Sequence, residues 1–352
     1  MPAPRLRLDT RRPPRTLVLQ SVPETALLPL KEIGPVDVFP NSQRTITKSE
    51  ILERIGDYEY VFALGEAPLD RDVLESAHRL RFIGMMEIMS MNLDLEAATS
   101  LGIGVSNLPN VVTETTADMT MALLLATARR IPEGDRMIRE RNWGQYQSMA
   151  LLGQPVNGKT IGILGAGNVG RAVARRALGF DMRVIYHDRH PLPAVLELDL
   201  DMTLCTLEEL FTESDFVVSC VTLTQSSRGL INARLLGLMK PTAILINTSR
   251  GQVVDEMAVV EAVRSGRIAG AGLDVFEREP PMADPGPIDE LLALPNVVVT
   301  PHLGTATEEM RTRMASIVTE NIVAYHRGLR PPNLLNPELF GEPALPESDR
   351  IG

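Results

Sequence analysis

Short apolar segments alternate with helical patterns along almost the whole chain of 352 residues. Such alternation is typical of α/β proteins, in which parallel strands are buried on both faces and read as continuous apolar runs. Because turn residues separate the runs, each run can be assigned to one strand. The pattern predicts two successive sets of strands, at 16–20, 36–39, 60–64, 81–85 and 104–107, and at 160–164, 183–186, 216–220, 243–247, 269–275 and 296–300.

Three longer segments have helical patterns. Two of them, 116–130 and 132–141, separate the two sets of strands, and the first contains the apolar run 119–128. That run is too short to span a bilayer, so we interpret it as a buried helix. The third, 308–326, is amphipathic and follows the last strand. A chain that returns in this way can close back over the first set of strands.

The start of the second set contains a glycine-rich motif. Residues 160–188 read TIGILGAGNVGRAVARRALGFDMRVIYHD, which predicts a strand, a turn, a helix, a second strand and an acid. Gly165 allows a tight turn, Gly167 lets a backbone approach a pyrophosphate, and Gly170 lets helix and strand pack closely. The free amides and the positive dipole end of the helix favour phosphate. This order predicts a dinucleotide site, with Asn168 and Val169 also in contact with the cofactor.

The acid at the end of the second strand bears on the choice of cofactor. Asp188 lies where a carboxylate can accept hydrogen bonds from a ribose diol, and it would repel a 2′-phosphate. We therefore expect NAD in preference to NADP. Arg189 leaves an alternative open, because an adjacent guanidinium either faces solvent or pairs with that phosphate.

Composition and charge are those of an ordinary soluble globular protein, with 44% hydrophobic and 23% charged residues. The net charge of −10 argues against a nucleic-acid partner, which needs a basic face. The two cysteines, Cys205 and Cys220, have neither metal-site nor CxxC spacing, which favours a reducing cytosol. The N-terminus lacks the apolar stretch of a signal peptide. We expect a cytoplasmic protein without a metal, nucleic-acid or membrane partner.

Three kinds of chemistry-bearing residue fall at predicted strand ends of the second set. His302 follows the apolar run in NVVVTPHLGTAT, at the sheet edge where open α/β proteins bind ligands. Arg250 ends AILINTSRG and can grip a carboxylate bidentately. Glu277 and Glu279 follow GAGLDVF, and either carboxylate could orient the imidazole and stabilise its protonated form, as a general acid requires. Spacing alone does not choose between the two glutamates.

With these motifs the chain resembles the D-2-hydroxyacid dehydrogenases, from about Leu17 to Pro337. The matching segments are GKTIGILGAGNVGRAVA, INTSRGQVVDE, AGLDVFEREP and VVVTPHLG, in the family's order and spacing. The resemblance implies that Arg250 binds the substrate, that Glu279 is the partner of the histidine, and that His302 is the acid/base. Residues 107–143 look most like the glyoxylate/hydroxypyruvate reductases, whereas YHDRHPLP looks more like a formate dehydrogenase segment.

The resemblance also implies the fold and the assembly. We expect two Rossmann-like domains with parallel sheets, in which a dinucleotide-binding domain, 110–305, is inserted into a flavodoxin-like substrate domain, 1–109 plus 306–352. A homodimer is expected through the cofactor domains and a helical arm at roughly 117–143. Further cofactor contacts are expected at Thr222, Thr248, Ser249, Asp274 and Gly304.

The reaction implied is NAD-dependent interconversion of a 2-oxo acid and a D-2-hydroxy acid by hydride transfer. The carboxylate and carbonyl of the oxo acid would lie near Arg250, while protonated His302 protonates the oxygen. Two alternatives remain. One is oxidation of a small acid, as in formate and phosphite dehydrogenases, although TPHLG with EREPP favours the hydroxyacid reading. The other is a non-catalytic NAD sensor resembling the C-terminal-binding corepressors.

One segment departs from the family pattern, at the loop expected to hold the substrate carboxylate with backbone amides. Residues 84–92 read GMMEIMSMN, where the family usually has small residues. In one reading the amides still point inward and the side chains point away. In the other, Glu87 disfavours a small acid dianion and a flexible methionine wall favours larger or less charged substrates. The substrate-loop residues are Met86, Glu87, Ile88 and Met89, and the wall would be made by Met85, Met86, Met89 and Met91.

Overall fold

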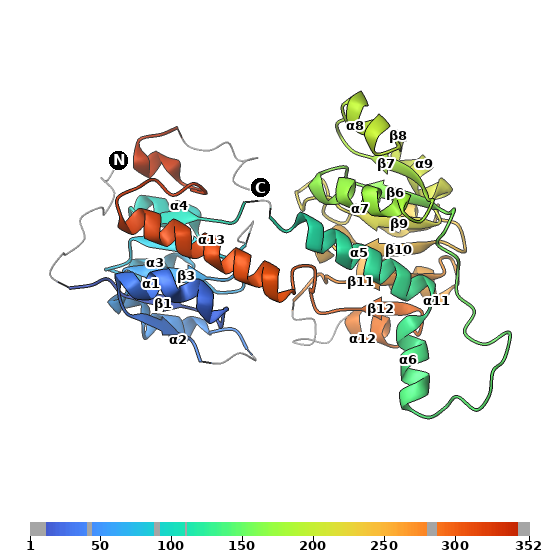
Figure 1. Ribbon diagram of the computed structural model, residues 1–352, viewed down its shortest axis with the longest axis horizontal. Coiled ribbons are helices and arrows are strands. Elements are labelled where there is room, and N and C mark those ends of the chain that lie inside the picture. Colours follow the sequence, from blue (N-terminus) through green and yellow to red (C-terminus); the bar gives the residue numbers. More distant parts are fainter. Residues whose placement is uncertain (1–11, 41–43, 88–91, 110, 280–286, 344–352) are drawn as a thin grey trace. The chain divides into compact units, whose positions relative to one another are not determined.

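The computed structural model describes residues 12–40, 44–87, 92–109, 111–279 and 287–343. The chain forms two compact units (Figure 1). The first unit contains Met1–Val111 together with Thr307–Gly352, and the second contains Val112–Ala306. Each unit has its own parallel sheet, so the predicted fold class of two α/β domains with parallel sheets is confirmed.

The sheet of the first unit has five strands in the order β2-β1-β3-β4-β5, all pairs parallel. This is the flavodoxin-type order, in which the chain reverses its direction across the sheet between β1 and β3. The carboxyl ends of these two strands therefore flank the switch point, where such sheets bind ligands. The strands are β1 (Thr16–Val18), β2 (Val36–Val38), β3 (Tyr60–Ala63), β4 (Phe82–Met85) and β5 (Gly104–Ser106).

Helix α13 (Glu308–His326) brings the end of the chain back to the first sheet, with the bounds that the sequence predicts. It packs on β4, where a Cβ on Gly84 would lie 2.6 Å from Val318 Cγ1 and 3.2 Å from Ile322 Cδ1. Glycine at this position therefore lets the helix approach the sheet closely. The remaining helices of the unit are η1 (Glu24–Leu27), α1 (Leu28–Ile33), α2 (Lys48–Leu52), η2 (Ile55–Asp57), α3 (Arg71–Ser76), α4 (Leu95–Ser100) and η5 (Pro337–Phe340).

The sheet of the second unit has seven parallel strands in the order β12-β11-β10-β9-β6-β7-β8. Its switch point lies between β6 and β9. The sequence did not predict β8, a three-residue edge strand with two exposed residues and hence no apolar run. The strands are β6 (Thr160–Leu164), β7 (Arg183–His187), β8 (Met202–Leu204), β9 (Phe216–Ser219), β10 (Ile244–Asn247), β11 (Gly270–Leu273) and β12 (Val297–Val299).

The central strands of this sheet are buried on both faces. In β10, Leu245 packs into one apolar cluster while Ile244 and Ile246 pack into another. In β9, Val217 and Val218 divide between the same two clusters. This double burial explains why the strands read as unbroken apolar runs in the sequence.

Helices cover the second sheet, and α5 (Thr113–Ala128) packs against α7 (Asn168–Leu178), β10 and β11. Arg130, with φ of 52°, separates α5 from α6 (Ile131–Arg139). No helix in the described part of the chain is long and apolar enough to cross a membrane. The other helices of this unit are α8 (Ala194–Asp199), α9 (Leu207–Glu213), α10 (Ala233–Leu236), η3 (Gly251–Val253), α11 (Glu256–Arg264) and α12 (Pro287–Leu292).

Candidate active site

The glycine-rich turn joins β6 to α7 beside the switch point of the second sheet. Gly165 has φ of +96°, a conformation that side chains disfavour. A Cβ on Gly165 would also lie 2.9 Å from the carbonyl carbon and oxygen of Cys220, the residue after β9. The turn therefore needs glycine both for its conformation and for its close approach to the neighbouring strand end.

The other two glycines of the motif have different surroundings. A Cβ on Gly170 would lie 2.1 Å from the Gly165 carbonyl oxygen and 3.1 Å from Ile163 Cγ2, so helix and strand are in direct contact there. A Cβ on Gly167 would meet nothing within 4 Å. Gly167 is the N-cap of α7, whose first amides have no partners within the helix. An open glycine beside free amides and a positive helix end fits the pyrophosphate of a dinucleotide.

Asp188 directly follows β7 and faces the same turn. Its Oδ2 accepts a hydrogen bond of 2.8 Å from the backbone N–H of Ala166, and its Oδ1 accepts one of 3.3 Å from that of His190. The carboxylate therefore lies beside the predicted pyrophosphate turn. Arg189 is exposed. Asn168, the first residue of α7, accepts a hydrogen bond of 2.6 Å from the Arg171 guanidinium.

Arg250 lies in a turn after β10 that is organised by a buried amide. Asn247, 1% exposed, donates from Nδ2 to the Arg250 carbonyl at 3.0 Å. Its Oδ1 accepts hydrogen bonds from the N–H and hydroxyl of Ser249 at 3.1 and 2.8 Å. The Ser249 hydroxyl also lies 2.9 Å from that of Ser219, and Thr248 Oγ1 lies 2.6 Å from Thr120 Oγ1. The turn that presents the arginine is thus tied to β9 and to α5.

His302 lies in the turn after β12 and has φ of +53°. This left-handed conformation is rare for residues other than glycine. It costs on the order of 1–3 kcal/mol and persists only where the surrounding structure imposes it. Here Asp274, 0% exposed, supplies the constraint. Its carbonyl accepts from His302 N at 2.9 Å. Its carboxylate accepts from Thr300 Oγ1, Leu303 N and Gly304 N at 2.6, 2.7 and 2.9 Å. Both carboxylate oxygens of Asp274 therefore hold the histidine turn.

His302 and Glu279 form a hydrogen-bonded pair. His302 Nδ1 lies 2.6 Å from Glu279 Oε2, and Glu279 Oε1 accepts from the Phe276 N–H at 2.9 Å. Burial would raise the pKa of Glu279, but the hydrogen bond and charge of His302, the Phe276 amide and the charge of Arg250 lower it below its usual value. The ionised carboxylate can only accept, so Nδ1 carries the proton and Nε2 is left for a substrate.

Spacing alone left two glutamates open as the partner of His302, and the family resemblance implied Glu279; the structure pairs His302 with Glu279. The Glu277 side chain is exposed, and its N–H donates to Glu256 Oε1 at 2.6 Å. Sequence reasoning singled out neither Glu256 nor Asn247. Glu256 begins a helix, where an acidic residue is common. Asn247 reads as the last residue of an apolar strand. Both residues lie in the matching segment INTSRGQVVDE, but their residue types alone indicate no role.

At the edge of the first sheet, the structure describes part of the expected substrate loop. Met85 is fully buried in the core of that unit, so its place in a pocket wall was predicted wrongly. Met86, 5% exposed, donates from its N–H to Ala63 O at 2.8 Å. The Glu87 carboxylate covers Gly65, where an added Cβ would lie 1.8 Å from Oε2. The remaining loop residues named from the sequence, Ile88, Met89 and Met91, lie outside the described residues.

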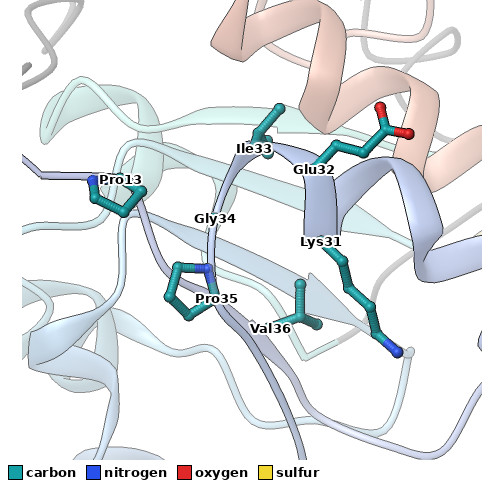
Figure 2. A pocket seen from close by; sticks show the side chains of 7 residues that line it. All are labelled: Pro13, Lys31, Glu32, Ile33, Gly34, Pro35 and Val36. Atoms are coloured by element: carbon teal, nitrogen blue, oxygen red, sulfur yellow. The ribbon is translucent and has the colours of Figure 1, made fainter.

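A hollow of ≈580 Å³ on the first unit has no part in this chemistry (Figure 2). Pro13 and residues 31–36 line it, so it lies just before β1 and at the start of β2. The hollow therefore lies at the amino ends of these strands, opposite to the edge where open α/β sheets bind ligands.

Comparison with known proteins agrees with this architecture. Residues 121–304 match the profile of the family described as "D-isomer specific 2-hydroxyacid dehydrogenase, NAD binding domain". The chain belongs to this family. It is similar to the glyoxylate reductase of Korarchaeum cryptofilum (strain OPF8), with 44% identity over 327 residues, 93% of this chain and 97% of that protein. The protein is therefore an oxidoreductase that uses a nicotinamide dinucleotide in 2-hydroxyacid chemistry.

Solved structures extend the likeness to the whole family fold. The TT0316 protein of Thermus thermophilus has a TM-score of 0.83 and 41% identity, with 91% of this chain and 99% of that chain covered. An NADPH-dependent glyoxylate/hydroxypyruvate reductase of Sinorhizobium meliloti has a TM-score of 0.75 and 30% identity, with 91% and 97% covered. A protein of this fold can thus depend on NADPH.

Proposed function

We propose that the protein reduces 2-oxo acids to D-2-hydroxy acids with NADH, with His302 as the acid/base and Arg250 as the residue that binds the substrate carboxylate. The observation that carries the proposal is the hydrogen bond of 2.6 Å between His302 Nδ1 and Glu279. It joins two carboxyl-edge turns of the sheet whose β6–α7 turn fits a dinucleotide. Arg250 ends a third turn at the same edge.

The roles of the side chains follow from their charges. Arg250 offers a fork of N–H donors that matches a carboxylate and polarises an adjacent carbonyl. Protonated His302 donates from Nε2 to the carbonyl oxygen as it becomes an alcohol, and takes the proton back in the reverse direction. Ionised Glu279 stabilises the imidazolium and holds its Nδ1–H. When bound, the reduced nicotinamide supplies the hydride.

We assign dinucleotide binding to residues 110–305 and substrate selection to residues 1–109 plus 306–352. The cofactor residues are the glycine-rich turn, Asp188, and the strand-end residues Thr222, Thr248, Ser249, Asp274 and Gly304. Because both carboxylate oxygens of Asp274 already accept hydrogen bonds, any contact it makes with the cofactor comes in addition to its hold on the His302 turn. Glyoxylate is the first substrate to test, because the Korarchaeum relative carries that name.

The preference for NADH over NADPH rests on Asp188. Its carboxylate lies beside the pyrophosphate turn, bonded to the Ala166 N–H, and would repel a 2′-phosphate. We expect kcat/KM to be at least tenfold higher with NADH than with NADPH, and Asp188→Ser to reduce that ratio. Equal efficiency with the two cofactors would show that Arg189 neutralises the phosphate, and would overturn this assignment.

A homodimer through the segment at roughly 117–143 completes the proposal. Helix α6 buries none of its residues within this chain, and Ile131, Ile138 and Trp143 are each more than half exposed. The helical part ends at Arg139, and no helix or strand follows before Thr160. Light scattering on purified protein would measure the mass, and a monomer at micromolar concentration would contradict the assembly.

The central experiment follows NADH oxidation with a panel of 2-oxo acids, from glyoxylate to bulky aliphatic acids. His302→Ala is expected to lower kcat by roughly 10²–10⁴-fold while NADH still binds. The control is His78→Ala, which removes an exposed histidine of the first unit. Unchanged turnover in His302→Ala would overturn the assigned mechanism. Tight NADH binding without turnover of any acid would instead favour a non-catalytic sensor.

A further inference from the structure

The segment that follows Arg250 is in unusually close contact with the segment that precedes Glu279. A Cβ on Gly251 would lie 1.8 Å from the Phe276 carbonyl carbon and 1.9 Å from its oxygen. Because the obstacle is backbone, no rotation of a side chain could relieve it. Glycine at this position is therefore required by space, and it brings two strand-end loops into direct backbone contact.

Two side chains extend this contact to the next residue. Gln252 Nε2 donates to the Glu277 carbonyl at 2.7 Å, and Glu256 Oε1 accepts from the Glu277 N–H at 2.6 Å. Both backbone polar groups of Glu277 are thus held by side chains from the loop and helix that follow Arg250. The Gln252 and Glu256 side chains, with Gly251, are called the clamp below.

Burying the carboxylate of Glu256 costs free energy, and the start of its helix does not require a buried acid. Glu256 is 8% exposed, and burial raises its pKa, as do the charges of Glu277, Glu279 and Asp255. The cap of its helix is supplied by Asp255, which accepts from the Ala258 N–H at 3.0 Å. The start of the helix therefore does not depend on Glu256. The Glu256 carboxylate instead accepts a hydrogen bond from the Glu277 N–H, in the loop that precedes Glu279.

The clamped backbone is the support of the His302 partner. The Phe276 N–H, next to the clamped residue, donates to Glu279 Oε1, and the other oxygen of that carboxylate is bonded to His302. We infer that Glu256 and Gln252 are positioning residues: they hold the Glu279 loop so that its carboxylate stays on His302 at a fixed place relative to the Arg250 turn. The inference rests on the proposed function, because it gives the His302–Glu279 pair a catalytic role.

The test compares variants that keep or remove the hydrogen bond. Glu256→Gln retains Oε1 as an acceptor and is expected to keep kcat within about threefold of the wild type. Glu256→Leu has no acceptor and is expected to lower kcat by about 10–100-fold, with the Kd for NADH unchanged. Gln252→Leu, at a half-buried position where misfolding is less of a risk, is expected to lower kcat by about 3–10-fold.

The pH profile separates positioning from a general loss of stability. When Glu279 is held less firmly, it stabilises the imidazolium of His302 less. The pH at which the rate of reduction falls to half should therefore be lower in Glu256→Leu and in Gln252→Leu than in the wild type. Glu208→Leu is the control, since Glu208 also lies in the first turn of a helix, α9, and its side chain pairs with Arg234 and not with a loop of this site. It is expected to leave the profile unchanged.

Two results would overturn the inference. One is a lower melting temperature in Glu256→Leu with an unchanged kcat and pH profile, which would make the clamp purely structural. The other is a loss in Glu256→Gln equal to that in Glu256→Leu, which would assign the effect to charge. Failure of the proposed function is seen separately, as absent turnover in the wild type or full turnover in His302→Ala.

Discussion

The two sheets of this protein share one architecture but present opposite surfaces at their switch points. In the second sheet the chain reverses direction beside β6, and the turn that follows ends in Gly167, whose Cβ position is empty to 4 Å. In the first sheet the reversal occurs beside β3, and Gly65 follows that strand. There the Cβ position lies 1.8 Å from a Glu87 carboxylate oxygen. The space beside Gly167 is therefore open to an anion, whereas the space beside Gly65 is filled by the carboxylate of Glu87.

The topology of each sheet therefore locates the edge at which a ligand binds, but the side chains at that edge decide which ligand binds. At the second sheet Asn247 and Asp274, both buried, hold the turns of Arg250 and His302 through hydrogen bonds to their backbones. At the first sheet a negative side chain occupies the edge. We therefore expect variants of the second edge to abolish the reaction and variants of the first edge to change which acid reacts.

The largest expected effect is the loss of the Arg250 fork. Removing one partner of a desolvated charge pair costs about 2–5 kcal/mol, so Arg250→Leu should lower kcat/KM for glyoxylate by roughly 30- to 5,000-fold. Arg250→Lys keeps the charge without the planar fork and should recover part of the loss. Steady-state kinetics measure both effects, with the Kd for NADH as the control. A loss of less than fivefold in Arg250→Leu would show that another group binds the carboxylate.

A pair of alanine variants separates the two functions of the glycine-rich turn. In Gly170→Ala the new methyl group would lie 2.1 Å from a backbone oxygen, so stability should fall by about 1–3 kcal/mol or more. In Gly167→Ala the methyl group has room, so only the N-cap preference for glycine over alanine is lost and stability should fall by less than in Gly170→Ala. The Kd for NADH should rise about tenfold. Thermal unfolding and NADH fluorescence titration measure the two properties. A loss of stability in Gly167→Ala as large as that in Gly170→Ala would contradict the open surface described for Gly167.

At the first edge the expected effect is smaller and has the opposite sign. Glu87→Gln removes a negative charge from the switch point of the first sheet, and should lower the KM for glyoxylate by about 3–10-fold at low salt. Because Glu87 is only partly exposed, higher ionic strength should reduce this change only in part. The control is Glu53→Gln, an exposed position at the end of α2. An unchanged KM for glyoxylate in Glu87→Gln would mean that the side chain is turned away from the substrate, the other reading left open by the sequence.

These regions also differ in how far the sequence alone describes them. The helix 308–326 and the strand 160–164 have the predicted bounds, because caps and turn residues mark their ends. The pairing of His302 with Glu279 and not Glu277 depends on how a loop folds back, and local spacing carries no record of that. Glu256 was missed for the same reason, since its partner is a backbone N–H 21 positions away. Met85 was misjudged because methionine is equally suited to a core and to a pocket wall.

The smallest effect concerns the stability that the His302–Glu279 pair gives to the second edge. The pKa of Glu279 is lowered in the folded protein, so its charge stabilises the fold above the ordinary value of 4.5, and this contribution is lost as the pH falls through the lowered value. Glu279→Gln should therefore be less stable than the wild type by on the order of 1 kcal/mol at pH about 6–7. The difference should vanish in acid, below the lowered pKa. Urea unfolding at a series of pH values measures it, with Glu277→Gln as the exposed control two residues earlier. A difference that stayed constant into acid would mean that packing, and not the ionised carboxylate, stabilises this turn. The charge of Glu279 would then contribute to the rate of the reaction but not to the stability of the fold.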